Sequence, residues 1–340
     1  MSLVQFETFF FHRKMHMIEQ NDSSRRRLMA AGAAGLLGSL LEGCGDATAQ
    51  SATSPPPYPD IADTSGASPE LVDFMKAFFA AKTRHNVDET MSFFAPDMVG
   101  YIDAGIGWDF AGFSAVKATY QQFMPAWPAS AKSYPTRILG DMTGGAMVAF
   151  VDTPELFGGE LRVLGAIDFK NGKIARWIDH WDFNAYDNLF GLARTPLTDY
   201  RQAAVGESAA AEMRTVVTSL CVALSTGNHG GAAALFSSDA VYEDMALRVQ
   251  VQGRQAIQRY LSRTVMLLPF GAGVTLRHTL GSAKGGGFEW NGASASPVRT
   301  GVSALMLDAE GKITRMTSVY DAALLSAPQR THLLSLSVDA

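Results

Sequence analysis

The body of this chain of 340 residues contains the same landmarks twice, and this repeat limits the possible fold more than any other feature of the sequence. The landmarks are a Phe-x-x-Asp motif, a segment of the form Gly-x-x-Ala followed by Val or Ile, and a Gly-Lys-Ile-x-Arg motif. They begin at Phe94, Gly112 and Gly172 in the first copy and recur 142, 141 and 139 residues later in the second copy. Because the three offsets agree so closely, the sequence predicts tandem copies of one unit of about 120 residues.

Each copy is predicted to be an α+β unit. Apolar periodicity predicts helices in the first copy over residues 70–86, 87–94 and 113–123. Alternation and turn residues predict strands over residues 98–103, 134–139, 146–152, 161–169 and 174–182. The second copy runs in the same way from a helix over 210–225 to a last strand that ends at Asp321. Helices that precede consecutive, hairpin-linked strands indicate an antiparallel sheet packed on helices.

The segments before the repeat predict an exported protein. Arg25 and Arg26 precede an apolar run over residues 28–41, which resembles a twin-arginine export signal and is too short for a transmembrane helix. Cleavage is expected after Ala49, or before Cys44, in which case the protein would be a lipoprotein. We therefore expect a signal peptide over 1–49, a Pro/Ser-rich tether over 50–68, contact with the twin-arginine translocase during export, and a mature protein in the periplasm or outside the cell.

Composition excludes several functional classes. The 28 basic and 33 acidic residues give a net charge of −5, which argues against nucleic acid or an anionic membrane as the main partner. Two cysteines cannot form a disulfide framework or a thiolate metal cluster, and the histidines lack the spacing of metal ligands. The sequence therefore predicts neither a metal site nor a cofactor.

The motifs together resemble the SnoaL-like branch of the nuclear transport factor 2-like superfamily. The resemblance rests on Phe-x-x-Asp before a short strand, a Gly-led helix and a closing strand of the form Gly-Lys-Ile-x-Arg-x-x-Asp-x-x-Asp, and it covers residues 69–325. It implies two tandem cone-shaped α+β barrels, each a curved antiparallel sheet wrapped on about three helices, over 69–190 and 205–325, with a C-terminal tail over 326–340. The family is similar in fold to ketosteroid isomerase, limonene epoxide hydrolase and scytalone dehydratase, so the fold does not select a reaction.

The two copies are expected to pack against each other. Related proteins pair as homodimers sheet against sheet, which implies an internal pseudo-dimer in a chain that carries two copies. Arg176 and Ile178 of the first closing strand, with Arg315 and Val319 of the second, are expected in or near that interface. The sequence leaves open how many chains form the whole assembly.

The difference between the closing strands is the sharpest indication of chemistry. Residues common to both copies are expected to serve the fold, whereas those of one copy are better functional candidates. Period-two alternation places Asp179 between Trp177 and Trp181 on one face, and the second copy has Ser318 instead of this acid. An aspartate enclosed by two indoles is poorly solvated, which raises its pKa and suits it to acid or base work near neutral pH. Asp179 is therefore the principal catalytic candidate.

Two further acids are candidates for its counterpart. The resemblance to limonene epoxide hydrolase implies Asp152 and Asp179 as the catalytic carboxylates, but Phe150 stands where that hydrolase has an arginine, and Arg162 is the candidate substitute. Asp103 lies one residue out of step with the catalytic aspartate of ketosteroid isomerase, whereas Asp244 of the second copy matches its spacing. The other expected ligand-binding residues are Tyr101, Trp127, Trp177, Trp181, Asp244 and His278.

Three classes of function remain open. The first is a cofactor-independent acid/base enzyme, such as a hydrolase, dehydratase, lyase or isomerase, that acts on a small apolar or aromatic molecule in the first cone. The second is a periplasmic protein that binds such a molecule without converting it. The third is a structural interaction module, which predicts cones filled by their own side chains.

Overall fold

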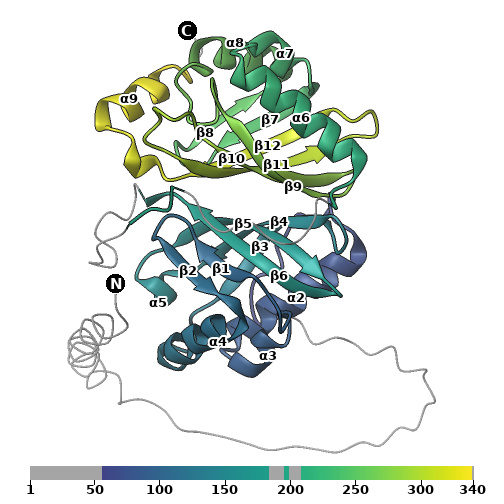
Figure 1. Ribbon diagram of the computed structural model, residues 1–340, viewed down its shortest axis with the longest axis vertical. Helices are drawn as coiled ribbons and strands as arrows, with labels where there is room; N and C mark the ends of the chain where they lie inside the picture. The colour runs from purple at the N-terminus through teal and green to yellow at the C-terminus, as the bar shows by residue number, and fades with distance from the viewer. Residues whose placement is uncertain (1–55, 184–194, 199–207, 339–340) are drawn as a thin grey trace, which may run out of the picture. The chain divides into compact units, whose positions relative to one another are not determined.

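The computed structural model describes residues 56–183, 195–198 and 208–338 (Figure 1). The predicted signal peptide over 1–49, including Arg25, Arg26 and Cys44, lies outside these residues. Among the described helices, none combines the length and the apolar character that crossing a membrane requires.

The first domain contains the predicted helices and strands and two elements that were not predicted, β2 and α5. Its elements are α2 (Pro69–Thr83), α3 (Val87–Met91), β1 (Gly100–Asp103), β2 (Trp108–Ala111), α4 (Gly112–Phe123), β3 (Ser133–Asp141), β4 (Gly145–Asp152), α5 (Pro154–Phe157), β5 (Leu161–Lys170) and β6 (Lys173–Trp181). The side chain of Ser68 caps α2 by accepting from the Leu71 amide, and Asn86 caps α3 by accepting from the Glu89 amide. These caps explain why the long apolar segment divides into two helices.

The second domain repeats the first. Its elements are α6 (Ala211–Ser225), α7 (His229–Ala233), β7 (Phe236–Asp244), β8 (Val249–Gln252), α8 (Arg254–Thr264), β9 (Thr275–Gly281), β10 (Gly285–Asn291), β11 (Thr300–Leu307) and β12 (Ile313–Tyr320). The C-terminal segment that was expected as a tail contains a further helix, α9 (Ala327–Ser335), capped by Ser326 and Gln329. The α+β class and the tandem arrangement of two units are therefore confirmed.

Both sheets have six strands in the same order, β2-β1-β6-β5-β4-β3 and β8-β7-β12-β11-β10-β9. Neighbouring strands are antiparallel except for β1 with β6 and β7 with β12, which are parallel. The expectation of purely antiparallel sheets is thus wrong at one pairing in each domain, because the first strand returns to lie beside the last. This pairing sets Asp103 next to Asp179 in the first domain and Asp244 next to Ser318 in the second.

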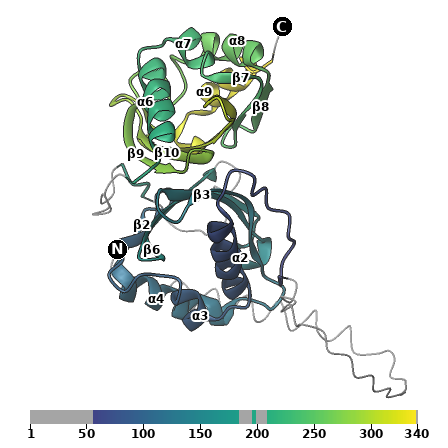
Figure 2. The same cartoon turned by 90° about the vertical axis from the view of Figure 1, so that its right-hand side faces the viewer.

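The helices of each domain gather on one side of its sheet (Figures 1 and 2). Helix α2 buries Leu71, Met75, Phe78 and Phe79, which share one helical face, in the core of the first domain. Helix α6 buries a corresponding face in the core of the second domain. Each sheet and its helices therefore enclose one interior, and the opposite face of the sheet is free to pack elsewhere.

The opposite faces of the two sheets pack on each other. Leu139 and Met147 of the first sheet form one apolar cluster with Leu280, Val302 and Val319 of the second. The expected pseudo-dimer is therefore present within the chain. Ile178 packs on Ile102 and Ala104 in a smaller cluster of the first domain.

A buried network of charges lies at the same interface. The guanidinium of Arg176 donates to both oxygens of Glu289 in the second domain, at 2.5 and 2.8 Å, and to Asp168 at 3.0 Å. His278 of the second domain lies 2.7 Å from the other oxygen of Asp168. His278 was expected to bind ligand, and this is wrong because its side chain faces the first domain rather than the interior of the second cone.

The last part of the expected tether is packed on the first domain. The backbone amide of Asp63 donates to Thr136 at 3.0 Å, and the amide of Ile138 donates back to Asp63 at 2.9 Å. Tyr58 is buried, and its hydroxyl donates to the carbonyl of Lys76. Residues from Tyr58 onward therefore extend the edge of the sheet beside β3.

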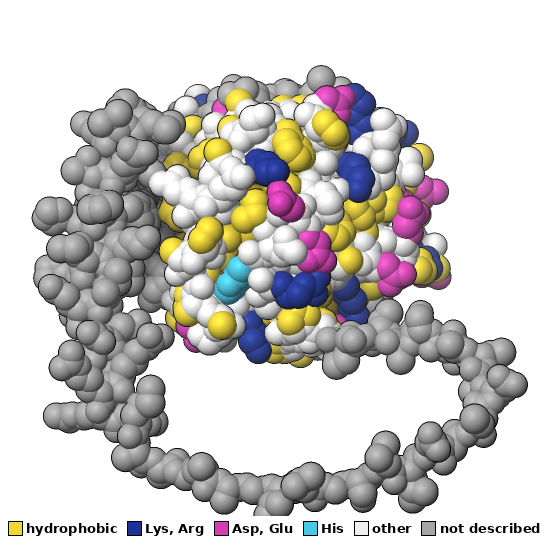
Figure 3. All heavy atoms as spheres, turned by 90° about the horizontal axis from the view of Figure 1, so that it is seen from below, with side chains coloured by type: hydrophobic (Ala, Val, Ile, Leu, Met, Phe, Trp, Pro, Cys, Tyr) yellow, Lys and Arg dark blue, Asp and Glu magenta, His cyan; other side chains and the backbone are white. Residues whose placement is uncertain are grey.

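Charged side chains of both signs are interspersed on the end of the molecule that carries α3 and α4 (Figure 3). Lys117 of α4 pairs with Asp88 of α3 at 2.8 Å, and Lys170 pairs with Asp97. Exposed pairs of this kind contribute little to stability, typically about 1 kcal/mol or less. The candidate site is consequently sought inside the cones.

Candidate functional site

A cavity of about 100 Å³ lies inside the first domain and is lined by residues of both helices and strands. Its polar lining residues are Lys82, Tyr101, Asp103, Tyr120, Asp152 and Asp179. Its aromatic lining includes Trp108, Phe123, Trp127, Phe157 and Trp181. The expected residues Tyr101, Trp127, Trp181 and the three acids are thus brought together in one cavity, which suits a small, largely apolar molecule that carries a polar group.

Asp179 is held at the cavity wall by two hydrogen bonds. The hydroxyl of Tyr101 donates to Oδ2, and the indole nitrogen of Trp177 donates to Oδ1 at 2.5 Å. Gly165 on β5 lies opposite Asp179, and a Cβ there would come within 2.8 Å of the Trp177 nitrogen. This glycine is therefore required for the contact between Trp177 and Asp179.

Trp177 was expected in the ligand site, and the structure corrects this. Its side chain is 1% exposed and is packed on Phe78 and Tyr101, with ring centroids 5.1 and 5.6 Å away. It does not line the cavity. Trp177 acts on the site through its hydrogen bond to Asp179.

Burial gives Asp179 a pKa that suits proton transfer near neutral pH. Its side chain belongs to a residue that is 4% exposed, and this loss of hydration is the largest cause that raises its pKa, to about 7. The bonds from Tyr101 and Trp177 and the charge of Lys82 lower the pKa, whereas the charge of Asp103 raises it further. Protonated and ionised forms of Asp179 therefore coexist near pH 7.

The raised pKa predicts how the stability of the protein depends on pH. Folding raises the pKa of Asp179 from 3.8 to about 7, so the folded protein binds more protons than the unfolded chain within this window. The free energy of unfolding is expected to fall as the pH rises from about 4 to about 7 and to level off above it. Asp179→Asn should remove a contribution of about 1.4 kcal/mol per unit of pKa difference.

Urea unfolding of the wild type and Asp179→Asn near pH 4 and above pH 7 checks this expectation. The matched control is Asp88→Asn, because the carboxyl of Asp88 is 85% exposed. The control should keep the wild-type pH dependence, and Asp179→Asn should weaken it. An unchanged pH dependence in Asp179→Asn would contradict the raised pKa.

Asp103 lies beside Asp179 but is occupied by the fold. Its carboxylate accepts bonds from the amides of Gly105 and Ile106, at 3.1 and 3.0 Å, and from the indole of Trp181 at 2.9 Å. Burial raises its pKa to about 6, which these bonds oppose. Asp103 therefore caps a turn, and its charge acts on the pKa of Asp179.

The second domain contains the same turn cap. Asp244 accepts from the amide of Leu247 at 2.9 Å and from the hydroxyl of Tyr320 at 3.0 Å, and burial raises its pKa to about 7. Asp103 and Asp244 pair with equivalent positions of the closing strands. The expectation that Asp103 is out of step with Asp244 is therefore wrong, and an acid shared by both copies is assigned to the fold.

Asp152 is the third acid of the cavity and forms a buried ion pair with Lys82. The ammonium of Lys82 lies 3.1 Å from Oδ1 and 3.4 Å from Oδ2, and both side chains are 7% exposed. The hydroxyl of Ser133 also donates to Oδ1. Lys82 therefore provides the cation that Arg162 was expected to provide.

Sequence reasoning missed Lys82, although a signal was present. Lys82 lies 11 residues after Leu71 and follows Met75 and Phe78 on the apolar face of α2. A lysine in the last turn of a helix is ordinarily explained by the helix dipole. Its place on the apolar face was the indication that this lysine is buried.

The second cone is filled by its own side chains. Trp290 and Tyr320 are fully buried, and the indole of Trp290 donates to Ser303, which is 2.8 Å from Ser318. A Cβ at Gly301 would lie 2.2 Å from the ring of Trp290, so this glycine leaves room for the indole. The position that corresponds to Asp179 is therefore a serine in a packed interior.

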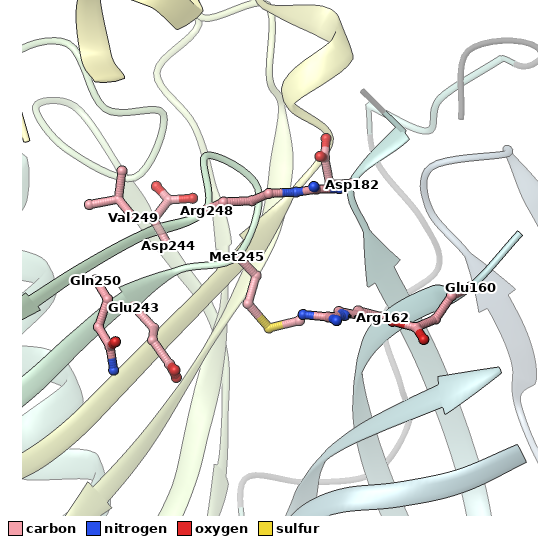
Figure 4. Close-up of a pocket in the computed structure, with 9 residues that line it drawn as sticks. All are labelled: Glu160, Arg162, Asp182, Glu243, Asp244, Met245, Arg248, Val249 and Gln250. Carbon is pink, nitrogen blue, oxygen red and sulfur yellow. Dashed lines mark hydrogen bonds and ion pairs between the residues drawn. The ribbon is translucent and has the colours of Figure 1, made fainter. Parts of the chain in front are cut away.

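A larger pocket of about 420 Å³ lies outside both cones (Figure 4). The side chains of Arg162 and Met245 point toward one another across it, from the first and the second domain. Arg162 is 71% exposed and pairs with Glu160 at 2.9 Å, so the expectation that it lies beside Asp152 in the cone is wrong. Asp244 also lines this pocket, but its oxygens are bound by Leu247 and Tyr320. Because its charged groups are hydrated, this larger pocket is a weaker site candidate than the cone.

Among the described residues, no group of three or more His, Cys, Asp or Glu side chains is arranged to hold a metal ion. No family model matches the sequence, and no curated protein sequence matches it.

Solved structures similar to parts of this chain include two proteins of unknown function. An NTF-2 like protein from Burkholderia xenovorans LB400 is 19% identical, with a TM-score of 0.28, over 32% of this chain and 83% of its own. A SnoaL-like protein from Burkholderia thailandensis E264 is 9% identical, with a TM-score of 0.29, over 32% of this chain and 94% of its own. A designed protein with a curved β-sheet is 16% identical, with a TM-score of 0.31, over 37% of this chain and 96% of its own. The assignment of two α+β units rests on the sheets and helices of the chain itself.

Proposed function

We propose that the first domain is a cofactor-independent acid/base enzyme that acts on a small apolar or aromatic molecule, and that Asp179 transfers the proton. The observation that carries this proposal is a buried carboxyl with a pKa of about 7 at the wall of an aromatic cavity. A general acid or base is most effective when its pKa lies near the working pH. The reaction classes that need such a group are those of a hydrolase, dehydratase, lyase or isomerase.

Three groups would share the work. Asp179 takes or gives the proton, and Tyr101 keeps its orientation and stabilises its anionic form by donating to Oδ2. Burial and the neighbouring charge of Asp179 raise the pKa of Tyr101 well above its ordinary value, so its hydroxyl stays a donor at neutral pH. Asp152 is balanced by Lys82 and is suited to positioning rather than to proton transfer.

The cavity volume limits the substrate. Ligand pockets for drug-sized molecules are commonly about 300 Å³ or more, whereas an apolar cavity of about 150 Å³ accommodates benzene. A cavity of about 100 Å³ therefore fits a molecule of about one ring or less. A panel of one-ring epoxides, hydroxy compounds and carbonyl compounds, analysed by NMR, should contain a compound that the wild type converts and Asp179→Asn does not.

The alternative is a binding protein with no turnover, which the closed aromatic lining of the cavity also suits. A compound that binds in the cone without being converted, to the wild type and Asp179→Asn alike, would favour this alternative. Conversion at equal rates by the two proteins would contradict the role of Asp179.

We also propose that the protein is exported by the twin-arginine route. The support is Arg25 and Arg26 in front of a short apolar run. Replacing both by lysine keeps the charge but should abolish export, as measured by the amount of protein in the periplasmic fraction. The matched control is Lys14→Arg, which changes a basic residue outside the pair and should leave export unchanged. Normal periplasmic yield of the double variant would overturn this proposal.

A further inference from the structure

A lysine ammonium lies on the surface of the cone cavity, which is unusual in an interior with so many aromatic residues. Lys82 is 6% exposed and lies at the end of α2, with its ammonium 5.1 Å from the centre of the Phe150 ring. It lines the same cavity as Asp179. A buried ammonium must have partners for its charge and its donors.

The hydrogen bonds of Lys82 do not use all of its donors. Its bonds to described residues go to the two oxygens of Asp152 alone, at 3.1 and 3.4 Å. An ammonium has three N–H donors, and one carboxylate uses at most two of them in this geometry. At least one N–H is therefore available for an acceptor inside the cavity.

The counter-ion of Lys82 is fixed in place. Asp152 accepts from the hydroxyl of Ser133 as well as from Lys82. The amide of Ser133 donates to Thr83 at 3.0 Å, and the hydroxyl of Thr83 donates back to the carbonyl of Ser133 at 2.7 Å. The ion pair is thus tied to α2 and β3, so the free N–H has a defined position.

Charge decides which acceptor suits this position. Lys82 and Asp152 are neutral as a pair, and Asp179 is close enough to feel the charge of Lys82. A ligand carboxylate would add a negative charge beside Asp152 and Asp179, which is costly in a poorly hydrated cavity. A carbonyl oxygen accepts a hydrogen bond without adding charge.

We propose that Lys82 binds the carbonyl oxygen of a neutral ligand of about one ring or less in the cone of the first domain. This names the substrate class of the site and rests on the proposed function. It predicts that the cavity distinguishes a ketone from a hydrocarbon of the same shape, because only the ketone offers an acceptor to the free N–H.

The test compares two probes of one shape, cyclohexanone and methylenecyclohexane, whose binding is measured by ligand-observed NMR. The variant is Lys82→Met with Asp152→Asn, which removes both charges together and leaves no unpaired carboxylate. The control is Lys76→Met, on the same helix, because Lys76 is partly exposed and pairs with Asp60 at the surface. The double variant should shift the ratio of the two dissociation constants toward the hydrocarbon by about tenfold or more, as expected for a lost bond to a charged donor.

Each outcome decides a different claim. An unchanged ratio in the double variant, or no binding of either probe to the wild type, overturns the role of Lys82. Asp179→Asn should keep the ratio of the wild type while it loses turnover. If the ratio depends on Lys82 but turnover does not depend on Asp179, the carbonyl site stands and the proposed enzyme function fails.

Discussion

Asp179→Asn is expected to lower turnover of a substrate of the first cone by roughly two to four orders of magnitude. Asparagine has nearly the shape of aspartate and can keep both contacts, since its oxygen can accept from Trp177 and its amide can donate to the oxygen of Tyr101. What it loses is the ability to take or give a proton. The measurement is kcat for wild type and variant with one substrate.

The second domain provides the matched control for this prediction. Ser318 occupies the position that corresponds to Asp179, in an interior filled by Trp290. Ser318→Ala should leave turnover within about twofold of the wild type, because no cavity reaches this position among the described residues. Equal losses in the two variants would mean that both cones share the work or that neither is catalytic.

Arg176→Met is expected to cost about 3–5 kcal/mol of the free energy of unfolding, because it leaves two acids buried without their cation. Glu289 is 0% and Asp168 4% exposed, and both accept from this guanidinium. Burial alone would raise the pKa of Glu289, but Arg176, with help from His278 and Arg277, lowers it below its ordinary value. The folded state therefore depends on this cation to keep the carboxylate ionised at the interface of the two sheets.

Arg315 gives the matched control, since it follows Arg176 by 139 residues in the repeat. Its side chain is 27% exposed and pairs with Glu243, which is 26% exposed. Arg315→Met should cost about 1 kcal/mol or less, as is usual for a partly hydrated pair. Urea unfolding of both variants measures the difference, and similar losses would show that the buried network does not hold the sheets together.

The tandem fold was predictable because the repeat marks the same turns twice. Gly172 and Gly311, at the last hairpin of each sheet, have φ angles of +70° and +72°, which glycine adopts without strain. The alternation along the closing strand was enough to set Asp179 and Trp181 on the face of the cavity. What failed was strand β2, Trp108–Ala111, because a strand of four residues carries too little periodicity to be recognised.

The candidate site was predictable only in part, because its decisive contacts join distant segments. Lys82 and Asp152 are 70 residues apart, and no local pattern indicates that they meet. The filling of the second cone depends on Gly301, whose missing side chain makes room for Trp290. The turn caps Asp103 and Asp244 were compared through an outside template, although the internal offset of 141 already made them equivalent.

The most direct test of the proposed chemistry is the titration of the Asp179 carboxyl, followed by carbon NMR of aspartate side chains in wild type and Asp179→Asn. It needs no substrate. The account predicts a carboxyl signal with a midpoint near pH 7 that is absent from the variant. If the signal that disappears in the variant instead titrates near the ordinary aspartate value of about 4, the carboxyl is ionised at neutral pH and the central claim is contradicted.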